Sequence, residues 1–359
     1  MSCISSYLYK IATLDYPLFA IEAAIYTDWF HNKHCMLRGH DLSERTKTKI
    51  QEIERVLETV IPQGKPLSLM GGPCGSILYY FYMSKMRDSS LLYDKAFDLL
   101  EHTLDFVEHA GIDTLTYCDG LVGFGTLFQL LAKEEFIDTK VDDVLLALDG
   151  HIVKYTNTQL QLGNLDFLHG ALGNGFYLVR RIGTPATDQC LAYLIDYLSA
   201  KAISDAQGIR WHDQSSSLNV FKSGAVDLGL AHGLSGKLVF LAQCVKANVK
   251  TVECTALLAG GLRFLQHQAH PKSKGNVYPL VITAATDQLP SNRLAWCYGD
   301  LCIATAFLAA GKALNNVAWA EHAFRIALRA AKRITPDRTA LVDAGLCHGT
   351  AGVAHIFNR

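Results

Sequence analysis

The 359-residue sequence has little of several features that mark particular classes of protein. Charged residues make up only 19% and the formal net charge is -1, so it lacks the basic excess typical of nucleic-acid-binding proteins. Met1–Lys10 has no basic segment followed by an apolar one, which argues against a secretory signal. No uninterrupted apolar run approaches the roughly 20 residues of a membrane span, so we expect a protein that is not transmembrane.

Cysteine, in contrast, is well represented. Ten cysteines without a recognisable signal peptide favour a reducing compartment and a cytoplasmic protein. Thiols in such a compartment serve as core fillers, nucleophiles or metal ligands. Half of the residues are hydrophobic, which together with the balanced charge predicts a globular enzyme.

A Gly-x-x-Gly motif followed by an apolar stretch recurs along the chain. Five copies are complete, and a sixth carries Cys302 in place of the second glycine. The first glycines are Gly72, Gly120, Gly170, Gly233, Gly299 and Gly349, at spacings of 48, 50, 63, 66 and 50 residues. A period of about fifty residues fits one helical hairpin with its loops, which indicates a repeat architecture.

Two kinds of helix are expected to alternate with this period. Runs directly after the glycines are apolar on nearly all sides, as helices buried on both faces are; they include 77–81, 127–131, 176–179 and 238–242. Amphipathic segments lie between them at 91–109, 141–155, 187–198, 252–267 and 317–331. Apolar inner helices alternating with amphipathic outer ones predict an all-α fold, an α/α toroid. The paired glycines let the inner helices approach closely where they begin.

Two parts of the chain depart from the period. Residues 1–66 carry no motif and are expected to add helices to the same domain as the toroid of residues 67–359. The clearest of these helices is Leu42–Ile61, with Ser43 as its N-cap. Gly208–Asp227 and Lys272–Leu294, rich in polar and β-branched residues, predict long loops or short hairpins above the ring.

Ligand-type side chains gather just before the first glycine of each repeat. In the last two repeats these are Cys297 and the pair Cys347–His348, and neighbouring repeats are adjacent in space. Two thiolates and an imidazole make a three-ligand zinc site with an open fourth position, as in catalytic zinc sites. Such a site would bind a substrate thiol as thiolate and keep its sulfur nucleophilic. The alternative is that both cysteines are buried small hydrophobes.

Three further polar residues are expected near this site. His232 matches His348 in repeat position, Asp166 lies one helical turn before its glycine, and Arg293 lies four residues before Cys297. Around a thiolate they would supply a proton donor, an orienting carboxylate and an oxyanion stabiliser. Taken singly, each also fits a structural role.

Other candidates are weaker. Cys118 and His169 occupy the same repeat positions in earlier repeats, so we expect them to line the pocket. His31-Asn-Lys-His34-Cys35 has helical metal-site spacing but is better interpreted as a solvated turn, and so is the segment with His267 and His270.

Together these loops resemble the lanthionine synthetase C family. Its His-Gly-x-x-Gly, Trp-Cys-Tyr-Gly and Cys-His-Gly loops stand here as His232–Gly236, Trp296–Gly299 and Cys347–Gly349. The resemblance runs from about residue 67 to the end. It implies an α/α toroid that binds one zinc ion and closes thioether rings in ribosomally made peptides. A cysteine thiol of the peptide adds to dehydroalanine or dehydrobutyrine in a Michael-type reaction.

The resemblance also implies roles for residues and partners. By position it makes Cys297, Cys347 and His348 the zinc ligands, His232 and Asp166 the proton-transfer pair, and Arg293 and Tyr298 groups near the developing enolate. The substrate would be a dehydrated precursor peptide, supplied by a separate dehydratase and passed on to a transporter. The enzyme would be cytoplasmic and peripheral to the membrane in that complex.

The sequence departs from the family at two points. Cys302 stands where the second glycine of the zinc loop is common, so it would either crowd the start of the helix or fill a gap. The chain stops at Arg359, soon after His348, and we therefore expect the toroid to lack its last helices.

Three alternative functions stay open from the sequence. One is addition of glutathione to dehydrated residues, although the branch that does so tends to have His where this chain has Tyr298. A second is a non-catalytic zinc-binding scaffold for peptides, which loss of His232 and Arg293 would have favoured. A toroidal glycosidase would need paired carboxylates at the ring mouth, and only Asp119 and Asp166 are candidates.

Overall fold

The computed structural model describes residues 39–60, 67–109, 114–137, 141–212, 224–283, 293–341 and 343–358. Contacts divide the chain into two units, 1–60 and 61–359. The described part of the first unit is the helix α3 (Gly39–Val60). It begins three residues earlier than predicted, so Ser43 lies inside the helix and is not its N-cap. That residues 1–66 share a domain with the repeats stays a prediction.

The second unit contains the predicted alternation of two kinds of helix. The inner helices are α4 (Pro73–Arg87), α6 (Leu121–Lys133), α8 (Ala171–Leu178), α10 (Leu234–Lys246), α12 (Asp300–Leu314) and α15 (Thr350–Asn358). The outer helices are α5 (Ser90–His109), α7 (Val141–Gln161), α9 (Pro185–Lys201), α11 (Thr251–His267) and α13 (Val317–Ala331). A short helix, α14 (Pro336–Thr339), lies between α13 and the last glycine loop. Every inner helix begins at the residue that follows the first glycine of its repeat.

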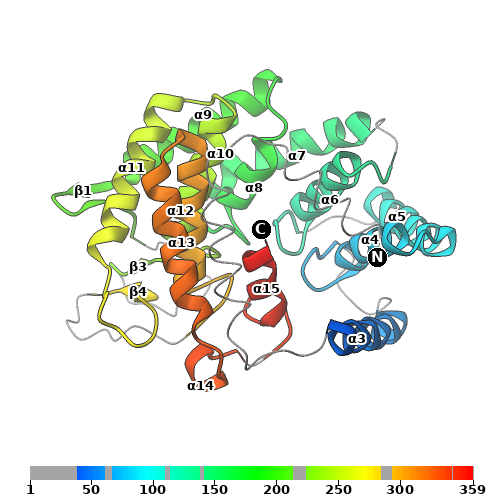
Figure 1. Ribbon diagram of the computed structural model, residues 1–359. Helices are drawn as coiled ribbons and strands as arrows, with labels where there is room; N and C mark the ends of the chain where they lie inside the picture. The colour runs from blue at the N-terminus through cyan, green and yellow to red at the C-terminus, as the bar shows by residue number, and fades with distance from the viewer. Residues whose placement is uncertain are drawn as a thin grey trace. The chain divides into compact units, whose positions relative to one another are not determined.

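The inner helices pack in the order of the repeats. Contacts join α4 to α6, α6 to α8, α8 to α10, α10 to α12 and α12 to α15. The outer helices α5, α7, α9, α11 and α13 each pack on the inner helix that precedes them. Figure 1 shows this succession from α4 through α8 and α10 to α12 and α15. The ends of the inner helices that carry the glycine loops therefore face a shared region.

The burial pattern explains why the two kinds of helix take these places. In α6, side chains on all sides are buried, including Val122, Phe124 and Leu127. In α13, buried residues lie on one stripe, at Ala323, Ile326 and Ala330. Full burial of a Leu or Phe side chain contributes about 1.5–3 kcal/mol, so an all-apolar helix is most stable between two layers.

The last inner helix is held by a small apolar cluster of its own. Leu294, Leu301 of α12, Ala330 of α13 and Val353 of α15 form its buried part. Ala327, Leu341 and Ile356 pack against it. This cluster places the loop that carries Cys347 and His348 beside the start of α12.

Steric crowding explains why the second residue of the motif pair is glycine. A Cβ atom at Gly173 would lie 2.0 Å from the carbonyl oxygen of Phe167, and one at Gly236 would lie 2.3 Å from that of Leu230. A methyl group therefore cannot fit without moving backbone. The loop and the first helical turn touch because no side chain separates them.

In the fifth repeat, which carries Cys302, the first glycine has a different backbone conformation. Gly299 has a φ of 95°, whereas Gly120, Gly170 and Gly233 have φ between -118° and -138°. The helix still begins directly after this glycine, and the Cys302 side chain is 1% exposed. Cys302 thus fills a gap and does not displace the helix start.

Two short antiparallel pairs come from the regions that interrupt the period. Strand β1 (Ile203–Asp205) pairs with β2 (Gly208–Arg210), and β3 (Val226–Asp227) pairs with β4 (Val281–Ile282). The second pair joins the two predicted loop regions, because Val226 lies opposite Ile282 and Asp227 opposite Val281. The middle of each region, 213–223 and 284–292, lies outside the described residues.

A buried polar network fixes the segment before α12. Arg333, 5% exposed, donates from Nη1 to Oδ1 of Asn276 at 2.6 Å. Asn276 Nδ2 in turn donates to the carbonyl oxygen of Arg293 at 2.9 Å. Asp300 accepts the amide hydrogen of Val277 at 2.8 Å, and its Oδ2 lies 3.7 Å from Arg333 Nη2. Burial raises the pKa of Asp300 although these partners lower it.

None of the helices in the described ranges is long and apolar enough to cross a membrane.

Candidate metal centre

Backbone hydrogen bonds join the glycine loops of neighbouring repeats to one another. Each bond runs from an amide two or three residues before the first glycine of one repeat to a carbonyl two residues before the first glycine of the next. They are Leu69 to Cys118 at 2.9 Å, Cys118 to Leu168 at 3.0 Å, Leu230 to Cys297 at 2.8 Å and Cys297 to Cys347 at 3.1 Å. Side chains that precede the glycines are therefore presented by adjoining loops, as the repeat predicts.

Cys297, Cys347 and His348 form a group whose ligand atoms all lie within 4.8 Å of one another. Cys297 is buried, Cys347 is half-buried and His348 is exposed, so the group opens to solvent on one side. A tetrahedral site with Zn–S bonds of about 2.3 Å places its ligand atoms roughly 4 Å apart. The donor set and its spacing therefore fit a zinc ion with one position left for a substrate.

The electrostatics of the group favour a thiolate at Cys297. A hydrogen bond from the Cys347 thiol, together with the charges of Arg293 and His348, lowers the pKa of Cys297 to about 7, against the effect of burial. The same hydrogen bond and burial raise the pKa of Cys347. Together these shifts favour one thiolate and one thiol in the pair, and a bound cation would favour two thiolates.

His232 and Asp166 meet across the boundary between the third and fourth repeats. Nδ1 of His232 lies 2.5 Å from Oδ2 of Asp166, and the amide of His169 donates to Oδ1 of Asp166 at 2.8 Å. Burial lowers the pKa of His232, but the bond and charge of Asp166, with the charges of Asp227 and Cys297, raise it overall. Burial raises the pKa of Asp166, and its hydrogen bonds with His232 and His169 lower it overall. An imidazolium–carboxylate pair is the favoured state.

Tyr298 belongs to the same face but its hydroxyl is already engaged. It donates to Oδ2 of Asp227 at 2.7 Å, and its ring centroid lies 6.4 Å from that of His232. Burial and the Asp227 charge raise the pKa of Tyr298, so it stays a neutral donor. Burial also raises the pKa of Asp227, although the bonds from Tyr298 and Gly229 oppose this.

The remaining residues predicted around the site lie at the expected loops. Arg293 stands within electrostatic range of both cysteine sulfurs, since its charge lowers the pKa of Cys297 and of Cys347. The His169 ring stacks on His232 with centroids 6.5 Å apart. Cys118 is near enough that its charge raises the pKa of Cys347. That Cys118 and His169 line a pocket stays a prediction.

Two residues of the site escaped the sequence argument. Asp227 and Asp343 each lie six residues before the first glycine of their repeat, at Gly233 and Gly349. Their carboxylates reach Tyr298 and His348 respectively. The sequence signal for both is their shared repeat position, six residues before the first glycine.

His267, another of the weaker sequence candidates, lies on an outer helix. His267 Nδ1 contacts the carbonyl oxygen of Arg263 at the end of α11, an outer helix. The segment His31–Cys35 lies outside the described residues.

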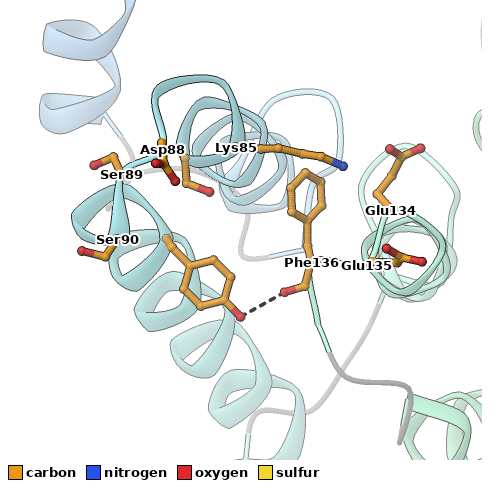
Figure 2. A pocket seen from close by; sticks show the side chains of 9 residues that line it. Lys85, Asp88, Ser89, Ser90, Glu134, Glu135 and Phe136 are labelled. Atoms are coloured by element: carbon orange, nitrogen blue, oxygen red, sulfur yellow. Dashed lines mark hydrogen bonds between the residues drawn. The ribbon is translucent and has the colours of Figure 1, made fainter. Parts of the chain in front are cut away.

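A hollow elsewhere in the second unit holds none of the predicted site residues (Figure 2). It lies between the ends of α4 and α6 that are opposite their glycine loops, and it is lined by Ser84, Lys85, Asp88, Ser89, Ser90, Tyr93, Glu134, Glu135 and Phe136. The Tyr93 hydroxyl donates to the Phe136 carbonyl oxygen at 3.0 Å, which ties α5 to the loop after α6. This hollow is separate from the metal centre.

Comparison with known proteins gives consistent matches. The family described as lanthionine synthetase C-like protein matches residues 64–359. Nisin biosynthesis protein NisC of Lactococcus lactis subsp. lactis is 24% identical over 315 residues, which cover 81% of this chain and 72% of that protein. A solved structure of nisin cyclase superposes with a TM-score of 0.69 at 20% identity, covering 89% of this chain and 81% of that one. The predicted α/α toroid is confirmed by this likeness in fold.

Proposed function

Because the chain belongs to the lanthionine synthetase C-like family, we propose that it is a zinc-dependent cyclase of lanthipeptide biosynthesis. It adds cysteine thiols of a dehydrated precursor peptide to dehydroalanine or dehydrobutyrine and so forms lanthionine thioether rings. The observation that carries this proposal is the group of Cys297, Cys347 and His348 beside the His232–Asp166 pair. The relatives named as a nisin biosynthesis protein and a nisin cyclase agree with it.

Cys297, Cys347 and His348 would hold one zinc ion. When bound, zinc would lower the pKa of a substrate thiol, while two thiolate ligands would keep its sulfur electron-rich. The positive charge of Arg293 adds favourable potential at the two cysteine sulfurs and lowers the pKa of both thiols. The opening beside the exposed His348 is the side from which the peptide thiol would arrive.

His232 would supply the proton that the addition needs. The substrate sulfur forms a bond to the β-carbon of the dehydrated residue, the carbon–carbon double bond is lost, and the α-carbon accepts a proton. The thiol proton is released when the thiol enters the site, so the reaction is balanced without an oxidant or reductant. The raised pKa of His232 favours its protonated form, and Asp166 orients the ring.

Arg293 would stabilise the negative charge that develops on the peptide carbonyl during the addition, and the Tyr298 ring would lie beside this group while its single O–H stays on Asp227. Arg293 is held by its backbone, since Asn276 donates to its carbonyl oxygen. Tyr298 is held by Asp227, which accepts from its hydroxyl. The Tyr298 side chain is therefore fixed by a neighbour that the substrate does not have to move.

The wider setting follows from the same proposal. The dehydrated peptide requires a dehydratase, which we take to be a separate protein. A transporter, a cytoplasmic site of action and a peripheral association with the membrane complete the proposed biosynthetic complex. If the chain formed no thioether rings in the test below, the glutathione-adding enzyme or the non-catalytic scaffold would be the favoured function.

The test uses the purified chain, a dehydrated peptide with one cysteine, and mass spectrometry after thiol alkylation. We expect about one zinc per chain and loss of the alkylatable thiol without change of peptide mass. Cys347→Ala should lose both zinc and ring formation. Cys254→Ala, which removes a buried thiol from the outer helix α11, is the matched control and should keep both.

Zinc without ring formation, but with addition of glutathione to the peptide, would favour the glutathione-adding enzyme. Zinc with neither reaction would favour the scaffold. A Cys347→Ala variant that kept zinc and cyclisation would contradict the proposed site.

A further inference from the structure

One position of the repeat forms the same local turn in three loops. It lies six residues before the first glycine and holds Asn164, Asp227 and Asp343. In each case Oδ1 accepts the amide hydrogen of the residue two positions later: Asp166 at 3.1 Å, Gly229 at 2.6 Å and Gly345 at 2.7 Å. This is an Asx turn, which Asn and Asp form equally well. The turn alone does not require a negative charge.

The second side-chain atom of this residue differs among the three repeats. Asn164 uses its Nδ2 to donate to structural acceptors, at 2.7 Å to Gln159 and 3.2 Å to the carbonyl oxygen of His169. Asp227 and Asp343 carry a carboxylate oxygen there instead. Oδ2 of Asp227 accepts from Tyr298, and Oδ2 of Asp343 lies 3.3 Å from Nε2 of His348. The carboxylate appears in the two loops where it reaches a residue of the proposed site.

Asp343 is itself held by the loop that carries His348. Its carbonyl oxygen accepts the amide hydrogen of Thr350 at 3.1 Å, and its Oδ1 is bound to Gly345. A Cβ atom at Gly349 would lie only 2.1 Å from that Oδ1, so the glycine allows the close approach. The carboxylate is thus fixed at both ends of the loop and presents Oδ2 to the ring.

We propose that Asp343 is a positioning residue of the metal centre, which accepts from Nε2–H of His348 and assigns Nδ1 to the metal. The inference rests on the proposed zinc site and concerns this chain's own residues. His348 is the one exposed ligand of the three, with 48% of its side chain accessible, so its ring needs an anchor that burial does not supply. A carboxylate on the second nitrogen fixes the tautomer and the plane of a metal-binding imidazole.

The test is the zinc affinity of Asp343→Asn, measured by competition with a chromophoric chelator. Asparagine keeps the turn, as Asn164 does, but presents an amide donor to the Nε2–H donor. We expect zinc affinity to fall by about 10- to 100-fold. The thermal midpoint of the metal-free protein should stay the same, because the turn is retained. Cobalt-substituted protein should show a changed visible absorption spectrum, since one ligand is no longer held in place.

Asp205→Asn is the matched control. Asp205 forms the same Asx turn with the amide of Gln207 at 2.9 Å, in the β1–β2 hairpin, and is not part of the metal centre. It should bind zinc as the wild-type chain does. Equal zinc affinity of Asp343→Asn and wild type would overturn this inference alone. A wild-type chain that binds no zinc would overturn the proposed function and this inference together.

Discussion

Nδ1 of His232 lies 2.5 Å from Oδ2 of Asp166, so a carboxylate of the third repeat holds the imidazole of the fourth. The pair is nearly buried, with 16% of the His232 side chain and 1% of the Asp166 side chain accessible. A buried pair of this kind keeps both groups charged, because each compensates the other's loss of hydration. The relationship defines the proton-donating state of the proposed site.

The first prediction concerns the pH dependence of ring formation. The pKa of His232 is raised above its ordinary value of 6.5, so the proton-donating form is present below that raised pKa and is lost as the pH rises through it. In Asp166→Asn the charge is removed while burial remains, so the alkaline limb of the rate profile should move to lower pH. The measurement is the rate of thiol loss from a dehydrated peptide at pH values from about 5 to about 9, a range that spans the usual titration of His.

His232→Ala is the companion variant and should lower the rate by about 10²- to 10⁴-fold, the usual contribution of a general acid. An unchanged pH profile in Asp166→Asn would contradict the assignment of the pair to proton transfer.

The second prediction concerns Tyr298 and Asp227. Tyr298→Phe removes the hydroxyl that donates to a carboxylate which is 3% exposed. Leaving a buried acceptor with one donor fewer should lower the free energy of unfolding by about 1–3 kcal/mol. Urea unfolding measures this loss. The same substitution in an Asp227→Asn background should cost less, and an equal cost in both backgrounds would show that the hydrogen bond is not its cause.

The third prediction compares two glycines. Gly173→Ala places a methyl group 2.0 Å from the Phe167 carbonyl oxygen and should destabilise the protein by more than about 1–3 kcal/mol, since backbone must move. Gly150→Ala is the control, because a Cβ there meets nothing within 4 Å and the residue lies inside α7. It should stabilise the protein by about 0.5–1 kcal/mol. Thermal unfolding of both variants checks the pair, and similar midpoints would contradict the steric role of Gly173.

The fourth prediction concerns the buried network around Arg333. Arg333→Leu leaves Asp300, which is 0% exposed, without its cationic neighbour and leaves Asn276 without its donor. We expect a loss of about 3–5 kcal/mol in the free energy of unfolding, as for one partner of a buried pair. Arg325→Leu on α13 is the control, since its pair with Glu321 is exposed and should contribute at most about 0.5 kcal/mol. Equal losses in the two variants would show that the network adds no stability.

The helices were predictable because their signals are local. An apolar run such as 127–131 indicates an inner helix, and a one-sided apolar pattern such as that of 317–331 indicates an outer helix. Neither requires knowledge of a distant partner. The repeat added long-range information, since equivalent positions in neighbouring repeats must be close. That argument brings Cys297 to Cys347 and His348, and their ligand atoms do lie within 4.8 Å. The roles assigned to these residues stay predictions.

Several relationships were beyond such reasoning. The hydrogen bond from Tyr298 to Asp227 joins residues 71 positions apart, and it depends on how one glycine loop packs against the next. The pairing of β3 with β4 joins two interruptions that the repeat does not relate. The positive φ of Gly299 could not be predicted either, because the first glycines Gly120, Gly170 and Gly233 of other repeats have negative φ.

By itself the sequence determined the period, the alternation of inner and outer helices, the family and the loops that carry the thiols and imidazoles. These follow from local apolar patterning and from motifs within single loops. Only the tertiary structure decided which atoms meet: His232 with Asp166, Tyr298 with Asp227, and Asp343 with His348. The physical reason is that a hydrogen bond is made or lost over less than 1 Å. The packing of each loop against its neighbours sets positions at that scale, and spacing along the chain does not.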